Sequence, residues 1–360
     1  MKKLLLVGAV IASSVAARAA TDEVVTCRRS AIAVALTPGA PATYTVSGEL
    51  CATPSERHAG TTVQLLIHGA TYNYEYWDFG RFDGVEYSYA RNVAAAGIPT
   101  FAFDQLGSGS SSRPPSDQLT IQAAAFVAHQ IVQELRNGLI AGIQFGKVIT
   151  VGHSLGSVVV WEEAINYADV DGVIVTGAAH SLTNRFVQSQ AFYPAANDPD
   201  FVGTGLDGGY LTTVPNVRVN LFYAPPDDDP AVVTSDEARK DVVSAAELNT
   251  ALPIVTTTAT QALQVPVLTI LGSNDLPTCG PSTTGGNFDC SSAASIVAQE
   301  TPFYSPKAKI HACLVSGSGH DLSLARNHRV QIEDAVAWSI ALVGQPGLTA
   351  SDTNLPSNCR

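Results

Sequence analysis

The chain has 360 residues, of which 46% are hydrophobic and 14% are charged, so it can bury a large core. Its formal net charge is −12 at pH 7. Such an acidic balance favours solubility and argues against nucleic acid and anionic membranes as partners.

The N-terminus has the pattern of a secretory signal peptide. Lys2 and Lys3 precede an apolar stretch at residues 4–15, and residues 17–19 (Ala-Arg-Ala) match a cleavage site. The stretch is too short to span a bilayer, and no later segment reaches about 18 uninterrupted apolar residues. We therefore expect residues 1–19 to be removed and the mature protein to be secreted, extracellular or periplasmic, without stable membrane insertion.

Six cysteines remain after that cleavage, and an even number in an exported chain suggests disulfides. The short loop between Cys279 and Cys290 favours that pair. A bridge between Cys27 and Cys51 would then link the first hairpin, which leaves Cys313 to pair with Cys359. The expected pairs are Cys279 with Cys290, Cys27 with Cys51, and Cys313 with Cys359. The chain has no C-x-x-C motif, so we expect no thiolate metal site, and we predict neither a metal nor a cofactor.

The predicted elements begin with residues 24–50, whose alternating pattern suggests antiparallel edge strands. Apolar runs then predict buried parallel strands, and stretches of helical spacing lie between or after them. The strands are expected at 62–68, 99–104, 148–151, 172–176, 265–271 and 310–315, and the helices at 121–135 and 330–342. This alternation predicts a doubly wound, mostly parallel sheet with helices on both faces.

The alternation is interrupted at residues 181–261, which contain aromatics, prolines and an acidic run but no clean periodicity. A structureless loop of about 80 residues would be unusual in a compact domain. We therefore expect a cap inserted into one domain, whose core comprises residues 20–180 and 262–360.

Residues 152–156 (Gly-His-Ser-Leu-Gly) form a G-x-S-x-G pentapeptide between a predicted strand and a predicted helix. The reversal from strand to helix forces the central residue into a strained turn and exposes the Ser154 hydroxyl at the carboxyl edge of the sheet. A serine hydroxyl is a poor nucleophile near neutral pH and needs a base, which in turn needs an orienting carboxylate.

Two later strands supply these partners. Asp275 lies on the loop after strand 265–271, and His320 lies just beyond strand 310–315. The chain order Ser154, Asp275, His320 is the order that this type of site requires. The other histidines considered for the base are expected to be surface or packing residues: His68, His129, His153, His180, His311 and His328.

Attack on a carbonyl creates an oxyanion, which preorganised N–H donors must stabilise. One donor is expected from Leu155, the residue after the nucleophile. The second is expected from the loop after strand 62–68, where the Ala70 amide is the first choice and Thr71 the second.

Together these segments resemble the α/β-hydrolase fold superfamily over residues 60–345. The resemblance rests on four features. They are His68-Gly69, the G-x-S-x-G turn at residues 152–156 (the elbow), the loops that carry Asp275 and His320, and residues 104–111 (Asp-Gln-Leu-Gly-Ser-Gly-Ser-Ser). It implies the α/β-hydrolase fold with an inserted cap and a serine hydrolase with acyl-enzyme chemistry. It assigns Asp104 to a structural turn, and Gln105 stands where relatives often carry arginine. Haloalkane dehalogenases and epoxide hydrolases of this fold use an aspartate at the elbow, so Ser154 argues against both.

Aromatic residues follow the oxyanion loop and recur in the predicted cap, which favours an apolar ester or lactone as substrate. The predicted substrate contacts are Tyr72, Trp77 and His153. Hydrolysis of an amide or a carbon–carbon bond with the same triad remains an alternative, as does a non-catalytic binding protein on this scaffold. The oligomeric state is left open.

Overall fold

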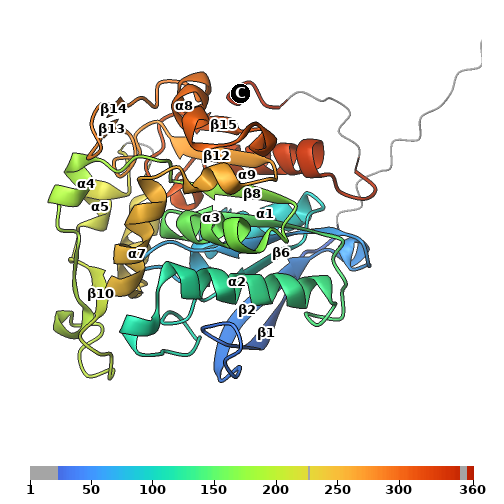
Figure 1. Ribbon diagram of the computed structural model, residues 1–360, viewed down its shortest axis with the longest axis horizontal. Coiled ribbons are helices and arrows are strands. Elements are labelled where there is room, and N and C mark those ends of the chain that lie inside the picture. The colour runs from blue at the N-terminus through green and yellow to red at the C-terminus, as the bar shows by residue number, and fades with distance from the viewer. Residues whose placement is uncertain (1–22, 226–227, 349–354) are drawn as a thin grey trace, which may run out of the picture.

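The computed structural model describes residues 23–225, 228–348 and 355–360, so the predicted signal peptide lies outside the described residues. A central sheet of eight strands has the order β1-β2-β6-β3-β7-β8-β12-β15 (Figure 1). Its strands are β1 Thr26–Val34, β2 Tyr44–Ala52, β3 Thr62–Ile67, β6 Thr100–Phe103, β7 Lys147–His153, β8 Gly172–Thr176, β12 Val267–Gly272 and β15 His311–Val315.

The sheet is parallel from β6 to β15, and β1 and β2 form the antiparallel edge. This arrangement confirms the predicted fold class. All six residues of β3 and all five of β8 are buried, as expected for parallel strands that helices cover on both faces. Continuous apolar runs therefore located these strands well.

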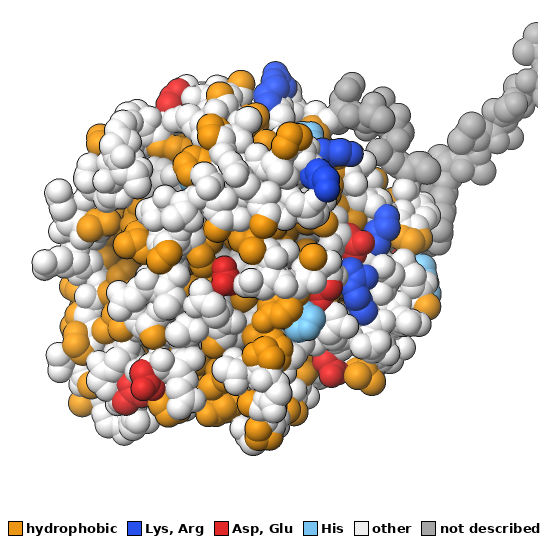
Figure 2. Space-filling model, in the orientation of Figure 1, with side chains coloured by type: hydrophobic (Ala, Val, Ile, Leu, Met, Phe, Trp, Pro, Cys, Tyr) orange, Lys and Arg blue, Asp and Glu red, His pale blue; other side chains and the backbone are white. Residues whose placement is uncertain are grey.

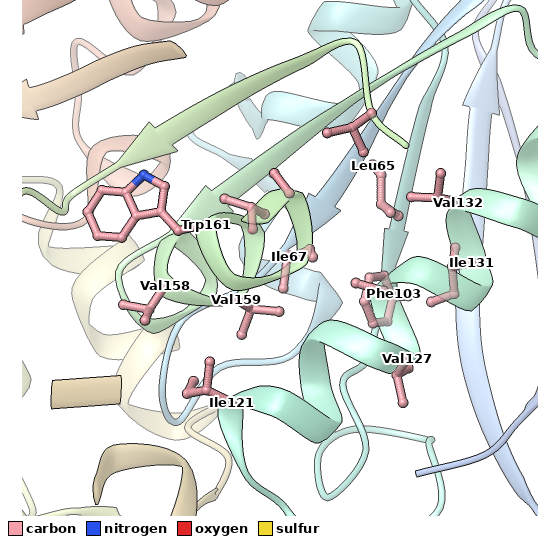
Figure 3. Packing of buried hydrophobic residues seen from close by; sticks show 14 of the residues in the cluster. Leu65, Ile67, Phe103, Ile121, Val127, Ile131, Val132, Val158, Val159 and Trp161 are labelled. Carbon is pink, nitrogen blue, oxygen red and sulfur yellow. The ribbon is translucent and has the colours of Figure 1, made fainter. Parts of the chain in front are cut away.

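Helices cover both faces of the sheet. The helices α2 Ile121–Arg136 and α3 Leu155–Tyr167 lie on one face, and α1 Tyr89–Ala95 and α9 Arg329–Trp338 pack together on the other. Leu65 and Ile67 point toward α2 and α3, whereas Leu66 belongs to the opposite cluster, because strand side chains alternate between faces. Figure 3 shows Leu65, Ile67 and Phe103 of the sheet facing apolar side chains of α2 and α3.

The region predicted as a cap, residues 181–261, contains several short elements. They include a three-stranded sheet in the order β11-β10-β9. In chain order they are α4 Asn184–Gln188, β9 Phe192–Pro194, β10 Tyr210–Thr213, α5 Arg218–Leu221, α6 Pro230–Ala238, β11 Val243–Ser244 and α7 Ala245–Val255. Ser244 and Glu247 form a capping box that starts α7. Figure 1 shows α4, β10 and α7 gathered on one side of the sheet.

Smaller elements lie elsewhere on the main domain. The hairpin β4 Asp78–Phe82 and β5 Val85–Ser88 precedes α1, and β13 Gly280–Pro281, β14 Asn287–Phe288 and α8 Ala293–Glu300 lie between β12 and β15. The sequence analysis did not anticipate these elements. They are short, and none has a run of apolar residues long enough to stand out from its surroundings.

The six cysteines form the three predicted disulfides, Cys27–Cys51, Cys279–Cys290 and Cys313–Cys359. The first joins directly opposed residues of β1 and β2, and the last ties β15 to the C-terminal segment. Within the described ranges, no helix combines the length and hydropathy needed to cross a bilayer. The face of the molecule drawn in Figure 2 carries few charged side chains, and its Lys and Arg residues gather toward the right-hand side.

Candidate active site

Ser154 occupies a sharp turn between β7 and α3. Its backbone has φ 52° and ψ −118°, a strained conformation for a residue with a side chain. Gly156 makes the turn possible, since a Cβ there would lie 2.3 Å from the carbonyl oxygen of Ile67. The Ser154 N–H donates to the Thr176 carbonyl at 2.8 Å. Three neighbouring strands therefore hold the serine in this strained turn at the end of β7.

His320 and Asp275 lie in contact on the loops that follow β15 and β12. The His320 Nδ1 is 3.1 Å from both carboxylate oxygens of Asp275, and both side chains are buried. The two loops touch closely, because a Cβ on Gly272 would lie 2.2 Å from the Gly319 carbonyl oxygen. With Nδ1–H donating to the carboxylate, the other ring nitrogen, Nε2, is left to accept a proton.

Burial and Asp275 act in opposite directions on the His320 ring. Burial by itself would lower its pKa by disfavouring the charged imidazolium. The charge of Asp275 and its hydrogen bond to the ring outweigh that effect, so the pKa of His320 is raised above its usual value. A raised pKa makes His320 a stronger base than an isolated histidine.

Ser154 and His320 line one cavity of about 140 Å³. Among the described residues that line it there is no Asp, Glu, Lys or Arg. The apolar wall comes from α3, the predicted cap and the loops around them: Val158, Phe186, Phe192, Phe222, Leu248, Ala251, Leu252 and Val255. The cavity therefore suits an apolar group held beside a hydroxyl and an imidazole.

Ala70 and Leu155, the expected oxyanion donors, also line this cavity. Among the described residues, neither amide N–H donates to a backbone carbonyl. Leu155 is the first residue of α3, where N–H groups have no partner within the helix and the helix dipole favours negative charge. Thr71, the second choice for the loop donor, is buried and does not line the cavity.

Thr71 instead anchors the loop after β3 to the predicted cap. Its φ is 61°, which is strained for a β-branched residue. The Arg218 guanidinium on α5 donates to the Thr71 hydroxyl at 2.9 Å, and the Asp241 N–H donates to the Thr71 carbonyl at 2.8 Å. Arg218 is buried and also pairs with Asp236 of α6 at 2.8 Å. Side chains of the predicted cap therefore help to fix the loop that carries Ala70.

The three predicted substrate contacts have different environments. Tyr72 lines the cavity, and its hydroxyl donates to Asp321 at 2.5 Å. Trp77 and His153 are fully buried and lie outside the cavity wall. Trp77 packs against neighbouring tyrosine rings, and His153 stacks on Tyr76 with ring centroids 4.2 Å apart. The structure gives these two residues a packing role behind the site, which corrects the expectation that they touch the substrate.

Asp321 is a buried neighbour of the site that the sequence analysis did not single out. One carboxylate oxygen accepts from Tyr72, and the other lies 3.4 Å from Nε2 of His153. Burial and the negative charge of Asp236 raise the pKa of Asp321 to about 7. Its position directly after His320 could have marked it as a residue near the site. Nothing in the sequence, however, showed that its side chain turns inward.

The contacts of His180 and Asp104 argue against a catalytic role for either residue. His180 pairs with Glu300 at 2.8 Å in the interior, and it does not line the cavity. Asp104 accepts from the backbone N–H groups of Tyr74 and Ser110, as the structural turn implied by the resemblance requires.

Comparison with known proteins shows the family of the chain. A sequence model described as the alpha/beta hydrolase family matches residues 64–331, which is more than half of the chain. The chain belongs to the alpha/beta hydrolase family. The match runs from β3 to α9 and therefore includes the elbow and the Asp275 and His320 loops.

One curated relative is Epoxide hydrolase A of Mycobacterium tuberculosis, which is 31% identical over 137 residues. This alignment covers 37% of the chain and only 37% of that relative's length. Similar solved structures include a thermophilic esterase from Thermogutta terrifontis, with 17% identity, a TM-score of 0.55, and coverage of 88% of this chain and 99% of that one. Another is a monoacylglycerol lipase from Paleococcus ferrophilus, with 19% identity, a TM-score of 0.51, and coverage of 77% and 96%. At these identities the two structures show a shared fold, and the family match supports hydrolase activity.

Proposed function

We propose that this hydrolase cleaves a carboxylic ester or lactone of an apolar substrate through a Ser154–His320–Asp275 triad. The observation that carries the proposal is the strained Ser154 turn opening on the same apolar cavity as His320, whose ring is held by Asp275. The sequence places these residues far apart, and the fold gathers them at the carboxyl ends of parallel strands.

The proposed mechanism has two acyl-transfer steps. The Ser154 Oγ attacks the carbonyl carbon while His320 Nε2 takes the hydroxyl proton, and that proton then goes to the leaving alkoxide. The Ala70 and Leu155 N–H groups stabilise the oxyanion. A water, deprotonated by His320, then attacks the acyl-enzyme and releases the acid and the free Ser154 hydroxyl. Asp275 orients the ring and stabilises the imidazolium in both steps.

The nucleophile decides between ester and epoxide chemistry, although one relative is an epoxide hydrolase. A carboxylate that opens an epoxide forms an ester, which water can hydrolyse to regenerate the enzyme. A serine that opened an epoxide would form an alkyl ether, which has no carbonyl for water to attack. Ser154 therefore supports acyl transfer as the reaction that can turn over.

The substrate class follows from the cavity. An acyl or alcohol group in contact with Phe186, Phe192 and Leu248 gains from burying apolar surface, about 25 cal/mol per Å². A charged group there would lose its hydration, and no Asp, Glu, Lys or Arg among the described lining residues could compensate that loss. The proposal therefore favours uncharged, apolar esters or lactones.

The experiment is hydrolysis of p-nitrophenyl acetate, butyrate and octanoate by the wild-type enzyme and Ser154→Ala. The substitution should lower kcat by a factor on the order of 10⁶. Ser181→Ala is the matched control, because it removes a hydroxyl that lines the same cavity, and it should retain most of the activity. Wild-type turnover in Ser154→Ala would refute the assignment.

A wider panel separates the ester proposal from its alternatives. Esters and lactones should be hydrolysed faster than matched amides, β-diketones and epoxides. Preference for an amide or a β-diketone, with Ser154 still essential, would retain the triad and replace the substrate class. A folded protein inactive on the whole panel would favour the binding-protein alternative.

We also propose that the protein is exported after removal of residues 1–19. The charge and hydropathy pattern of that segment supports the proposal, and so do the three disulfides, which persist in oxidising compartments. Mass spectrometry of the mature protein should find an N-terminus at residue 20, whereas retention of the segment in an exported protein would contradict it.

A further inference from the structure

Three potential metal ligands meet between α2 and α3, the two helices that lie side by side on one face of the sheet (Figure 1). They are His129 on α2, Glu163 on α3 and Asp169 just after α3. One ligand atom from each residue lies within 4.8 Å of the other two. The His129 Nδ1 and an Asp169 carboxylate oxygen are 2.7 Å apart.

Glu163 is the residue that needs an explanation. Its side chain is fully buried, and neither of its carboxylate oxygens has a hydrogen-bond partner among the described residues. The Oδ1 of Asp169 likewise has none. The second Asp169 oxygen, Oδ2, does have partners, in His129 Nδ1 and Gln133 Nε2. The Glu163 oxygens and Asp169 Oδ1, which have none, need a proton or a cation between them.

We propose that His129, Glu163 and Asp169 bind a divalent transition-metal cation, with Zn²⁺ as the best match. An imidazole nitrogen with two carboxylates is a donor set that Zn²⁺ accepts, whereas Ca²⁺ prefers oxygen ligands alone. The His129 and Asp169 side chains are 24% and 17% exposed, so water can reach the site and complete the coordination.

The surroundings hold the ligands in place. The Tyr167 ring stacks on His129 with centroids 4.1 Å apart, and Gln133 Nε2 donates to Asp169 at 2.6 Å. The Arg136 guanidinium donates to the Asp169 backbone carbonyl, which ties the end of α3 to α2. Partners of this kind orient metal ligands and tune their affinity.

The site departs from the expectation that the chain binds no metal. Ligands at positions 129, 163 and 169 have no short motif spacing, so the sequence could not reveal the cluster. Two other groupings of possible ligands among the described residues each contain both cysteines of a disulfide, whose sulfurs are not free thiolates. Glu163 is nine residues beyond Ser154, roughly 13 Å along α3, so the site is separate from the proposed catalytic chemistry.

The test compares chelator-treated wild type, Glu163→Gln and Glu162→Gln. Glu162 is the matched control, since it is the neighbouring residue on α3 and hydrogen bonds to Gln122 outside the cluster. Zn²⁺ at 100 times its dissociation constant should raise the Tm of the wild type and the control by about 4 °C. Glu163→Gln should show no rise, because an amide is a poor ligand for Zn²⁺.

Equilibrium dialysis supplies a readout that does not depend on stability. The wild type and Glu162→Gln should each retain one Zn²⁺ per chain that Glu163→Gln does not, and His129→Gln serves as a second variant if Glu163→Gln does not fold. Equal Zn²⁺ binding by the wild type and the cluster variants, or no binding by any of them, would overturn the proposal. In the latter case a shared proton between Glu163 and Asp169 explains the pair.

Discussion

Replacing Arg218 with methionine should destabilise the protein and slow ester hydrolysis together. Arg218 and Asp236 are both buried, and their side chains meet at 2.8 and 2.9 Å. Removing the guanidinium leaves the Asp236 carboxylate buried without its partner, which costs about 3–5 kcal/mol of unfolding free energy. The lost hydrogen bond to Thr71 adds about 1 kcal/mol.

The double variant Arg218→Met/Asp236→Leu separates these contributions. It removes both charges, so most of the loss should be recovered, because well-packed apolar residues can replace a buried ion pair at little cost. The contact between Arg218 and Thr71 is absent in both variants. Both should therefore keep a lowered kcat, since the strained backbone at Thr71 is no longer fixed beside Ala70.

Urea unfolding gives the stabilities, and steady-state hydrolysis of p-nitrophenyl butyrate gives kcat and KM. Tyr72→Phe, which removes only the hydroxyl bonded to Asp321, leaves the Arg218–Asp236 pair intact and controls for nearby changes. If Arg218→Met were as stable as the double variant, the unpaired Asp236 carboxylate would not be the source of the lost stability. Unchanged kcat in both variants would show that the hydrogen bond from Arg218 to Thr71 does not support catalysis.

Four further predictions concern the acid–base pair, the disulfide beside it and the cavity wall. Because the pKa of His320 is raised and the neutral ring is the base, kcat/KM should rise with pH through a midpoint above about 6.5, and a lower midpoint would contradict this. Asp275→Asn should lower kcat roughly 10³- to 10⁴-fold and shift that midpoint downward, which a pH–rate profile measures. Reducing Cys279–Cys290 should lower activity more than it changes far-UV circular dichroism, because Cys279 N–H donates to the Asp275 carbonyl at 2.7 Å; equal loss of both signals would argue against it. Ala251→Phe should fill part of the cavity and shift preference toward shorter acyl chains in the p-nitrophenyl series, and an unchanged preference would place the acyl chain elsewhere.

The fold and the loops that carry Asp275 and His320 could be predicted because both depend on local patterns. The buried strands are continuous apolar runs, so the run predicted at 172–176 coincides with β8, Gly172–Thr176. Asp275 and His320 follow such runs directly, and parallel strands bring their carboxyl ends to one edge of the sheet. Chain position alone was therefore enough to suggest which side chains would meet.

Contacts that depend on side-chain direction could not be predicted. Trp77 and Tyr72 lie in the same aromatic stretch, yet one is enclosed in the core and the other lines the cavity. The Arg218–Asp236 pair and its contact with Thr71 join segments far apart in the sequence, within a region that has no clear periodicity. An aromatic or charged residue has the same sequence signature whether it faces a ligand or a neighbouring helix.

Covalent labelling with a fluorophosphonate tests the proposed nucleophile most directly. The reagent reacts with a serine only when a neighbouring base activates the hydroxyl. Peptide mass spectrometry of the labelled wild type should find one phosphonyl group, on Ser154, and Asp275→Asn should react much more slowly. A folded wild-type protein that stays unlabelled, or that carries the label on another serine, would contradict the proposed site.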